Sequence, residues 1–209
     1  MLISTDLLTF MAVVLGLFLV PGPAVLLVMT RTAQGGRRVG IATGLGIAVG
    51  DLIHTLAGAV GLSALLATSA LAFTIVKLAG AAYLLYLGVR ALLAKTAPDE
   101  ARAVVPLVPA IHAFWQAVPA ELLNPKTALF FLAFLPQFVH ADRSTVFAQF
   151  ACLGLVFVAM SAAYNTLLVL ALGPLGRALQ RFHWLVRWQG KIIGSIFIGL
   201  GIKVALQEQ

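Results

Sequence analysis

Two apolar stretches of the chain contain helix breakers where an ordinary membrane-spanning helix has none. The first is residues 17–27, which carry Pro21-Gly22-Pro23, and the second is residues 121–131, which carry Asn124-Pro125. A proline costs about 3 kcal/mol in a regular helix interior, because its ring clashes with the preceding turn and it lacks an amide proton. At membrane depth, freed backbone groups are tolerated only where protein or a water-filled cavity satisfies them. Paired interruptions in two halves of a chain therefore point to the binding site of a transporter.

The composition places the chain in the membrane. Hydrophobic residues make up 61% of the 209 residues and charged residues 10%, whereas a soluble domain has about 25% charged residues. A spanning helix needs about 20 apolar residues. The sequence predicts six such spans, which leave no soluble domain for an enzyme or a nucleotide site: 7–29, 39–66, 71–93, 113–139, 144–172 and 187–206.

The only long linker is predicted at 94–112, and it divides the single transporter domain 1–209 into two parts. Repeat one covers 1–93 and repeat two covers 113–209. Because each repeat has an odd number of spans, the second enters the membrane from the opposite side, which predicts two inverted three-helix repeats. The expected fold is an all-α integral membrane protein whose helices 1 and 4 are broken at Pro-Gly-Pro and Asn-Pro.

The basic residues predict the orientation of the chain. Lys and Arg mark cytoplasmic loops, so the net charge of +7 reflects membrane topology and not a nucleic-acid partner. Both termini are then expected outside. The residues that carry this argument follow spans one and three or lie around the gap before span six: Arg31, Arg37, Arg38, Arg90, Lys95, Arg102, Arg177, Arg181, Arg187 and Lys191.

Asp51 lies near the middle of span two, in a bilayer core that is about 30 Å thick. An acid there costs roughly 2.5–3.5 kcal/mol and is usually functional. His54 follows at i+3, on the same helix face. We expect Asp51 and His54 to couple transport to protons, and a buried, hydrogen-bonded acid and a core histidine are the alternatives. Gly46-x-x-x-Gly50, in the same span, is expected to allow close helix approach.

The second interruption brings opposite charges together. Pro125 frees the carbonyl of Glu121, and a half-helix that begins near Lys126 would present amides and a positive dipole end to an anion such as a carboxylate. Glu121 and Asp51, with the freed carbonyls of Leu17 and Leu19, would receive an ammonium group. An internal ion pair of Lys126 with Glu121 or Asp51 is the alternative. The candidate substrate-binding residues are Pro21, Gly22, Pro23, Glu121, Asn124, Pro125 and Lys126.

Span five carries Ser161 and Asn165, four positions apart. They are expected either to face the same cavity or to form hydrogen bonds between helices.

No enzyme, cofactor or metal motif accompanies these features. His54, His112, His140 and His183 show no H-E-x-x-H spacing, and G-x-S-x-G and P-loop motifs are absent. Without a P-loop, the energy is expected to come from an ion gradient. The predicted mechanism is proton antiport, in which Asp51 takes a proton from outside and releases it inside as cytoplasmic substrate binds near Lys126.

Four motifs occur in this order along the chain: Pro21-Gly22-Pro23, Gly46…Gly50-Asp51, Gly80-Ala-Ala-Tyr83-Leu-x-x-Leu-Gly88 and Leu123-Asn-Pro-Lys126…Leu135-Pro-Gln-Phe138. Together they resemble the lysine-exporter (LysE/RhtB) family of amino-acid efflux proteins. The resemblance covers essentially the full length. It implies a bacterial inner-membrane secondary exporter of amino acids or their derivatives, such as threonine, homoserine, leucine or basic amino acids, and homo-oligomers. Glu121 departs from the family's pattern, so the substrate stays open.

Two other classes of function remain compatible with the sequence. One is a passive channel, or an exporter of another small solute or a metal ion, with the same fold. The other is a non-transporting membrane assembly partner, in which the charged residues only hold helices together.

Overall fold

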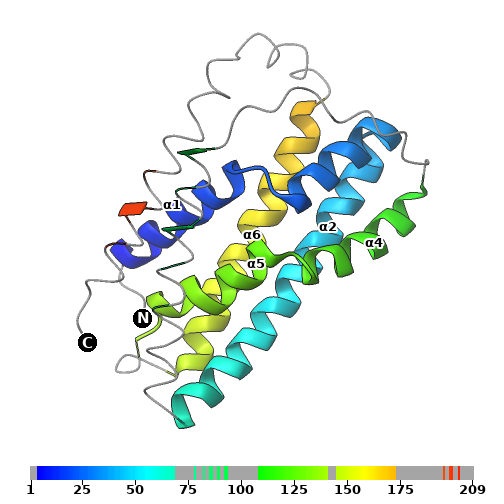
Figure 1. Cartoon of the computed structure of the whole chain (residues 1–209). Coiled ribbons are helices and arrows are strands. Elements are labelled where there is room, and N and C mark those ends of the chain that lie inside the picture. The colour runs from blue at the N-terminus through cyan, green and yellow to red at the C-terminus, as the bar shows by residue number, and fades with distance from the viewer. Residues whose placement is uncertain are drawn as a thin grey trace.

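The computed structural model describes residues 4–68, 108–140 and 145–172, with isolated positions between 78 and 93 and between 195 and 202. These ranges are helical, without a strand, so the predicted all-α class is confirmed for them. The elements are α1 (Ser4–Leu19), α2 (Pro23–Thr68), α4 (Ala110–Leu122), α5 (Pro125–Leu129), the π-helical η1 (Phe130–Phe134), the 3-10 helix η2 (Leu135–Phe138) and α6 (Val146–Leu172) (Figure 1).

Apolar helices of membrane-spanning length are present in the described ranges. Pro23–Gly61 within α2 and Val146–Leu172 are long and apolar enough to cross a bilayer, and Ala110–Leu122 with Pro125–Phe138 forms a third candidate, bent by 46°. Apart from isolated positions, the predicted spans 71–93 and 187–206 and most of the linker 94–112 lie outside the described residues. The arrangement as six helices in two inverted repeats therefore stays a prediction.

The two predicted helix breaks are confirmed. α1 ends at Leu19 and α2 begins at Pro23, while α4 ends at Leu122 and α5 begins at Pro125. In both cases a proline takes the first position of the following helix, where its missing amide proton costs nothing. The second broken helix begins at Ala110, three residues before the predicted start of span four.

The turn after span one is shorter than predicted. The predicted spans 7–29 and 39–66 leave residues 30–38 to the turn, but helical backbone continues to Gly36, whose φ of 72° and ψ of −173° interrupt α2. This positive φ is open to glycine and strained for other residues. The chain reverses there (Figure 1), and Val28 packs in one cluster with Ile47 across the turn.

Glycines of α2 allow the close packing that the sequence predicts. A Cβ on Gly46 would overlap the backbone carbonyl oxygen of Phe114 in α4, and one on Gly50 would lie 2.7 Å from Cβ of Glu121. On the side of α6, a Cβ on Gly58 would lie 2.5 Å from the Phe150 ring. Residues 37–61 are thus packed directly between α4 and α6, and both of these helices contribute residues to the site.

Gly46→Ala is expected to lower the free energy of unfolding by about 1–3 kcal/mol, because the new methyl group meets fixed backbone and not a mobile side chain. Thermal unfolding in detergent measures the effect. Gly61→Ala in the same helix is the matched control, since nothing lies within 4 Å of its new Cβ and alanine is the better helix former. Equal stability of the two variants would contradict tight packing at Gly46.

An aromatic core holds the second broken helix against α1 and α6. Phe130 packs on Phe10 with ring centroids 6.1 Å apart and on Phe157 at 4.9 Å. Residues 130–138 leave regular α-helical geometry, first as the π-helical turn and then as the 3-10 turn that includes Pro136. The core therefore fixes the segment that follows the Asn-Pro break.

Candidate functional site

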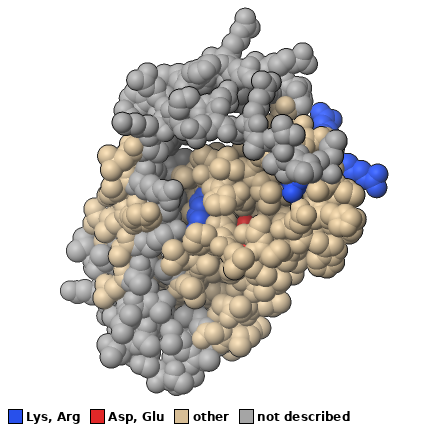
Figure 2. All heavy atoms as spheres, turned by 45° about the vertical axis from the view of Figure 1, so that its right-hand side comes forward, with Lys and Arg blue, Asp and Glu red and all other residues tan. Residues whose placement is uncertain are grey.

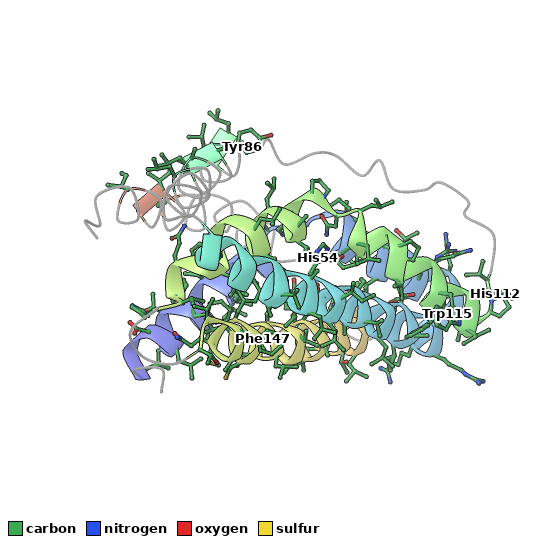
Figure 3. All side chains as sticks on the ribbon, turned by 90° about the horizontal axis from the view of Figure 1, so that it is seen from below. His54, Tyr86, His112, Trp115 and Phe147 are labelled. Carbon is green, nitrogen blue, oxygen red and sulfur yellow. The ribbon has the colours of Figure 1, made fainter. Side chains whose placement is uncertain are left out.

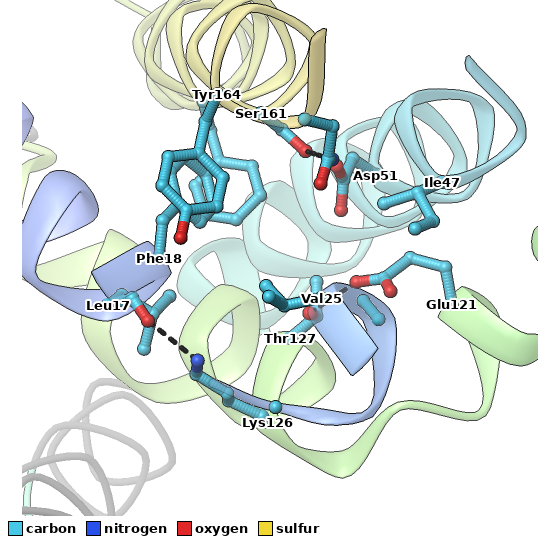
Figure 4. Close-up of a pocket in the computed structure, with 14 residues that line it drawn as sticks. Leu17, Phe18, Val25, Ile47, Asp51, Glu121, Lys126, Thr127, Ser161 and Tyr164 are labelled. Atoms are coloured by element: carbon cyan, nitrogen blue, oxygen red, sulfur yellow. Dashed lines mark hydrogen bonds between the residues drawn. The ribbon is translucent and has the colours of Figure 1, made fainter. Parts of the chain in front are cut away.

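A pocket lies where the two helix breaks meet (Figure 4). It comprises about 380 Å³ of space between atoms, including its open mouth. Figure 2 shows a basic and an acidic group inside a hollow among uncharged side chains of the described residues. Its lining comes from α1, α2, α4, α5 and α6 and from the break before α2: Leu17, Phe18, Gly22, Ala24, Val25, Ile47, Asp51, Glu121, Lys126, Thr127, Phe157, Ser161, Tyr164 and Asn165.

Lys126 connects the two breaks. Its side chain passes over Gly22, where a Cβ would lie 3.1 Å from Cδ of the lysine. Its ammonium group donates hydrogen bonds to the carbonyl oxygens of Leu17 and Val20, both at 2.6 Å. These carbonyls are free because α1 ends there. The carbonyls at the end of α1 were expected to bind an ammonium group of the substrate, but in this structure they bind the ammonium group of Lys126. The carbonyls involved are those of Leu17 and Val20, and not the predicted pair Leu17 and Leu19.

In the described part of the structure, Lys126 forms neither of the two ion pairs that the sequence offered as alternatives. Among the described residues its ammonium bonds to backbone carbonyls, and no ion pair joins it to Asp51 or Glu121. Its third N–H remains available to a ligand, because an ammonium group has three donors.

The carboxylate of Glu121 is held within its own helix break. Thr127 donates to Oε1, and the Asn124 amide donates to Oε1 at 3.3 Å and to Oε2 at 3.1 Å. The Asn124 side-chain oxygen in turn accepts from the backbone amide of Lys126 at 3.1 Å. Asn124 is therefore the N-cap of α5, and one of the amides expected to be free for an anion is already used.

His54 joins α2 to the same break. Its Nε2 lies 3.2 Å from the carbonyl oxygen of Glu121, and it is the donor, since a carbonyl only accepts. The ring also stacks on Phe131, with centroids 5.6 Å apart. Figure 3 shows His54 midway along the bundle, away from His112 at the start of α4. The carbonyl that Pro125 was expected to free thus has a partner.

Asp51 is buried, and its carboxyl group has no hydrogen-bond partner among the described residues. It is 1% exposed, and neither carboxyl oxygen has a hydrogen bond within the part of the chain that the structure describes, although Glu121 and Ser161 lie beside it. The residue lines the pocket from α2 (Figure 4). An uncompensated charge in such a place is costly, so the carboxyl group must carry a proton or meet a cation.

α6 contributes polar groups to the pocket that sequence reasoning left undecided. Asn165 donates from Nδ2 to Ser161 Oγ at 3.5 Å, while its Oδ1 is buried without a hydrogen bond among the described residues. Their four-residue spacing in an apolar helix was the available signal. Tyr164, which stacks on Phe18 with centroids 5.4 Å apart, carried no signal in the sequence.

Some of the predicted site residues line the pocket, and the others form or support the helix breaks beside it. Gly22, Asp51, Glu121 and Lys126 line the pocket. The remaining candidates do not, and they form the breaks or their supports: Pro21, Pro23, His54, Asn124 and Pro125. No cluster of three or more His, Cys, Asp or Glu residues suited to a metal ion occurs within the described ranges.

Comparison with known proteins places the chain in a family. Residues 15–208 match the family model of the LysE type translocators. An uncharacterized membrane protein of Pseudomonas aeruginosa is 33% identical over 96% of this chain and 95% of its own. A leucine efflux protein of Klebsiella pneumoniae is 27% identical over 95% and 93%, and one of Salmonella typhimurium is 28% identical over 94% and 93%. No solved structure matches the chain.

The family match extends over both helix breaks and over every residue that lines the pocket. It agrees with the apolar helices of spanning length and with relatives that are named as membrane and efflux proteins. The expectation of a transporter in place of an enzyme is thereby confirmed, and the chain belongs to the LysE type translocator family.

Proposed function

We propose that the protein is a secondary-active exporter of amino acids or their derivatives, driven by proton antiport. The observation that carries the proposal is one pocket, between two broken helices, that holds a cation and an unpaired acid at Lys126 and Asp51. A free amino acid also has separate positive and negative groups. The leucine efflux proteins among the relatives support the same substrate class.

The proposed substrate-binding frame consists of the two breaks. The substrate carboxylate approaches the third N–H of Lys126, next to Gly22, where the absence of a side chain leaves room. Glu121 provides negative potential on the opposite side for the substrate's ammonium group. Pro21, Pro23, Asn124 and Pro125 keep the backbone open at both breaks. Apolar side chains such as Val25, Ile47 and Phe157 surround the rest of the substrate.

Proton coupling is proposed for Asp51, with His54 supporting it from the next turn of α2. Asp51 takes a proton from outside and releases it inside as cytoplasmic substrate binds near Lys126. Moving one charge through 100 mV supplies about 2.3 kcal/mol. The placement that we propose is the bacterial inner membrane with both termini outside, as the basic loops predict, and homo-oligomers are part of the proposal.

Efflux of preloaded, labelled amino acids from proteoliposomes, with and without a pH gradient, tests this function. Leucine is the first substrate to use. A pH gradient should accelerate efflux and should allow transport against a concentration gradient. A passive channel would show downhill flux only, another cargo would leave amino acids inside, and an assembly partner would give no flux at all.

Asp51→Asn is expected to abolish the acceleration by the pH gradient, because an amide cannot exchange a proton. Leucine efflux with and without the gradient should become equal within about twofold, where the unchanged protein shows at least a tenfold difference, which corresponds to about 1.4 kcal/mol. Gradient-driven efflux that persists in this variant would overturn the role of Asp51.

A further inference from the structure

The pocket has more buried acceptors than donors on one side. Both oxygens of Asp51 and Oδ1 of Asn165 are buried without a hydrogen bond among the described residues. The two residues are 1% and 4% exposed, and both line the pocket. Figure 4 shows Asp51 and Ser161 facing each other, from α2 and α6, at the edge of the pocket that is farther from Lys126. Buried polar groups are normally satisfied, and beyond the Ser161 hydroxyl beside Asp51 this side offers its acceptors to a donor that arrives from outside the protein.

Glu121 differs from Asp51 in this respect. Its two oxygens already receive hydrogen bonds from Thr127 and Asn124. Donors of this kind stabilise a carboxylate without a cation. Asp51 therefore remains the acid that needs a mobile positive species.

We propose that Asp51 is a single shared site, occupied either by the coupling proton or by the ammonium group of the substrate, with Asn165 and Ser161 completing the ammonium subsite. An ammonium group has three N–H donors. The unpaired oxygens of Asp51 and Asn165 and the hydroxyl of Ser161 provide acceptors on two facing helices. This inference rests on the proposed export of amino acids.

The exchange balances in charge and atoms. With a proton on Asp51, the carboxyl group is neutral and the subsite lacks the anion that an ammonium group needs. When a zwitterionic amino acid binds, its ammonium group pairs with the carboxylate and the O–H proton leaves to water. Binding of either species excludes the other, and mutually exclusive binding by itself couples their movements in opposite directions.

The other titratable groups that face Asp51 come from α2, α4, α5 and α6. Glu121 faces it from α4, Lys126 from α5 and Tyr164 from α6, and His54 lies one turn along α2. The described part of α1 adds only Leu17 and Phe18 to the pocket. Glu121, Lys126 and His54 are each engaged in hydrogen bonds within or between the helix breaks.

Calorimetry on the purified full-length protein tests the inference. Leucine is titrated in buffers of different ionisation enthalpy, so that the protons released per bound leucine are measured directly. At pH values where Asp51 is protonated in the free protein, we expect about one proton released, and an affinity that rises about tenfold per pH unit. Asp51→Asn should bind leucine without proton release and without dependence on pH. N-acetylleucine, which lacks the ammonium group, should neither bind nor release protons.

A second variant tests the contribution of α6. Asn165→Leu should weaken leucine binding about tenfold while the proton release is kept. N-methylleucine has one N–H fewer, so the variant should discriminate less between it and leucine. Thr166→Val is the matched control, because the Thr166 hydroxyl bonds within its own helix to the carbonyl of Ala162 at 2.7 Å.

The outcomes separate this inference from the proposed function. Leucine binding without proton release, with an affinity independent of pH, would overturn the shared site even if efflux from proteoliposomes continues. Loss of proton release in Asn165→Leu, or unchanged discrimination against N-methylleucine, would overturn the ammonium subsite. Absence of both binding and efflux for every amino acid tested would instead remove the proposed function itself.

Discussion

Lys126→Met is expected to reduce leucine efflux by at least about tenfold, the equivalent of 1.4 kcal/mol or more. Methionine keeps the length and the apolar stem of lysine but removes the ammonium group. The carbonyls of Leu17 and Val20, which now accept hydrogen bonds of 2.6 Å from that group, lose their donor. An unpaired buried carbonyl costs about 1–3 kcal/mol. The cation expected to receive the substrate carboxylate is lost at the same time.

Two further variants decide how Lys126 acts. Gly22→Ala keeps the charge but places a Cβ 3.1 Å from Cδ of Lys126, so the side chain must shift. Efflux should fall less than in Lys126→Met, by about threefold to tenfold. Arg37→Met removes an exposed cation from the turn of α2 and serves as the control, with efflux within about twofold of the unchanged protein. Normal efflux in Lys126→Met, with normal amounts of protein in the membrane, would show that the site does not depend on this cation.

The helix breaks could be predicted because their cause is local. Proline removes a donor and clashes with its own helix, so Pro23 and Pro125 define where helices start, whatever surrounds them. The same holds for the freed carbonyl of Glu121 and for the small residues Gly46 and Gly50, whose role depends only on the missing side chain.

The partners of the charged residues could not be predicted in the same way. Lys126 had three candidates at the sequence level, and which one it meets depends on how α5 lies against α1. In the structure it bonds to Val20 and Leu17, 106 and 109 positions away in the chain, and not to either acid. Contacts between residues so far apart in the chain depend on how all the helices pack together. A short apolar stretch of sequence does not specify that packing.

The length of the turn inside α2 could not be predicted from the sequence either. Seven of the eight residues 31–38 suit a loop, since all except Ala33 are polar or glycine. The structure nevertheless limits the turn to Gly36, because only its positive φ is needed to reverse the chain. Propensity alone does not say how many residues a turn requires.

Glu121→Leu is expected to lower the free energy of unfolding by about 2–4 kcal/mol, because Thr127 and Asn124 would be left without their buried acceptor. Glu121 is 2% exposed, so water cannot replace the carboxylate. Glu121→Gln keeps one side-chain acceptor and should cost about 1 kcal/mol. Gln116→Leu on the same helix removes an exposed hydrogen bond from Arg31 of 2.8 Å and should change stability by less than about 0.5 kcal/mol. Denaturant titration in detergent measures all three.

Efflux by the same variants separates the structural role of Glu121 from its role towards the substrate. Glu121→Gln retains most of the break but loses the negative charge, so we expect efflux to fall about tenfold in a protein that still folds. If Glu121→Gln exports normally, the carboxylate only holds Thr127 and Asn124 in place, and Asp51 alone attracts the ammonium group. If Glu121→Leu is as stable as Gln116→Leu, the hydrogen bonds around Glu121 do not hold the second helix break, and the frame proposed for the pocket is wrong.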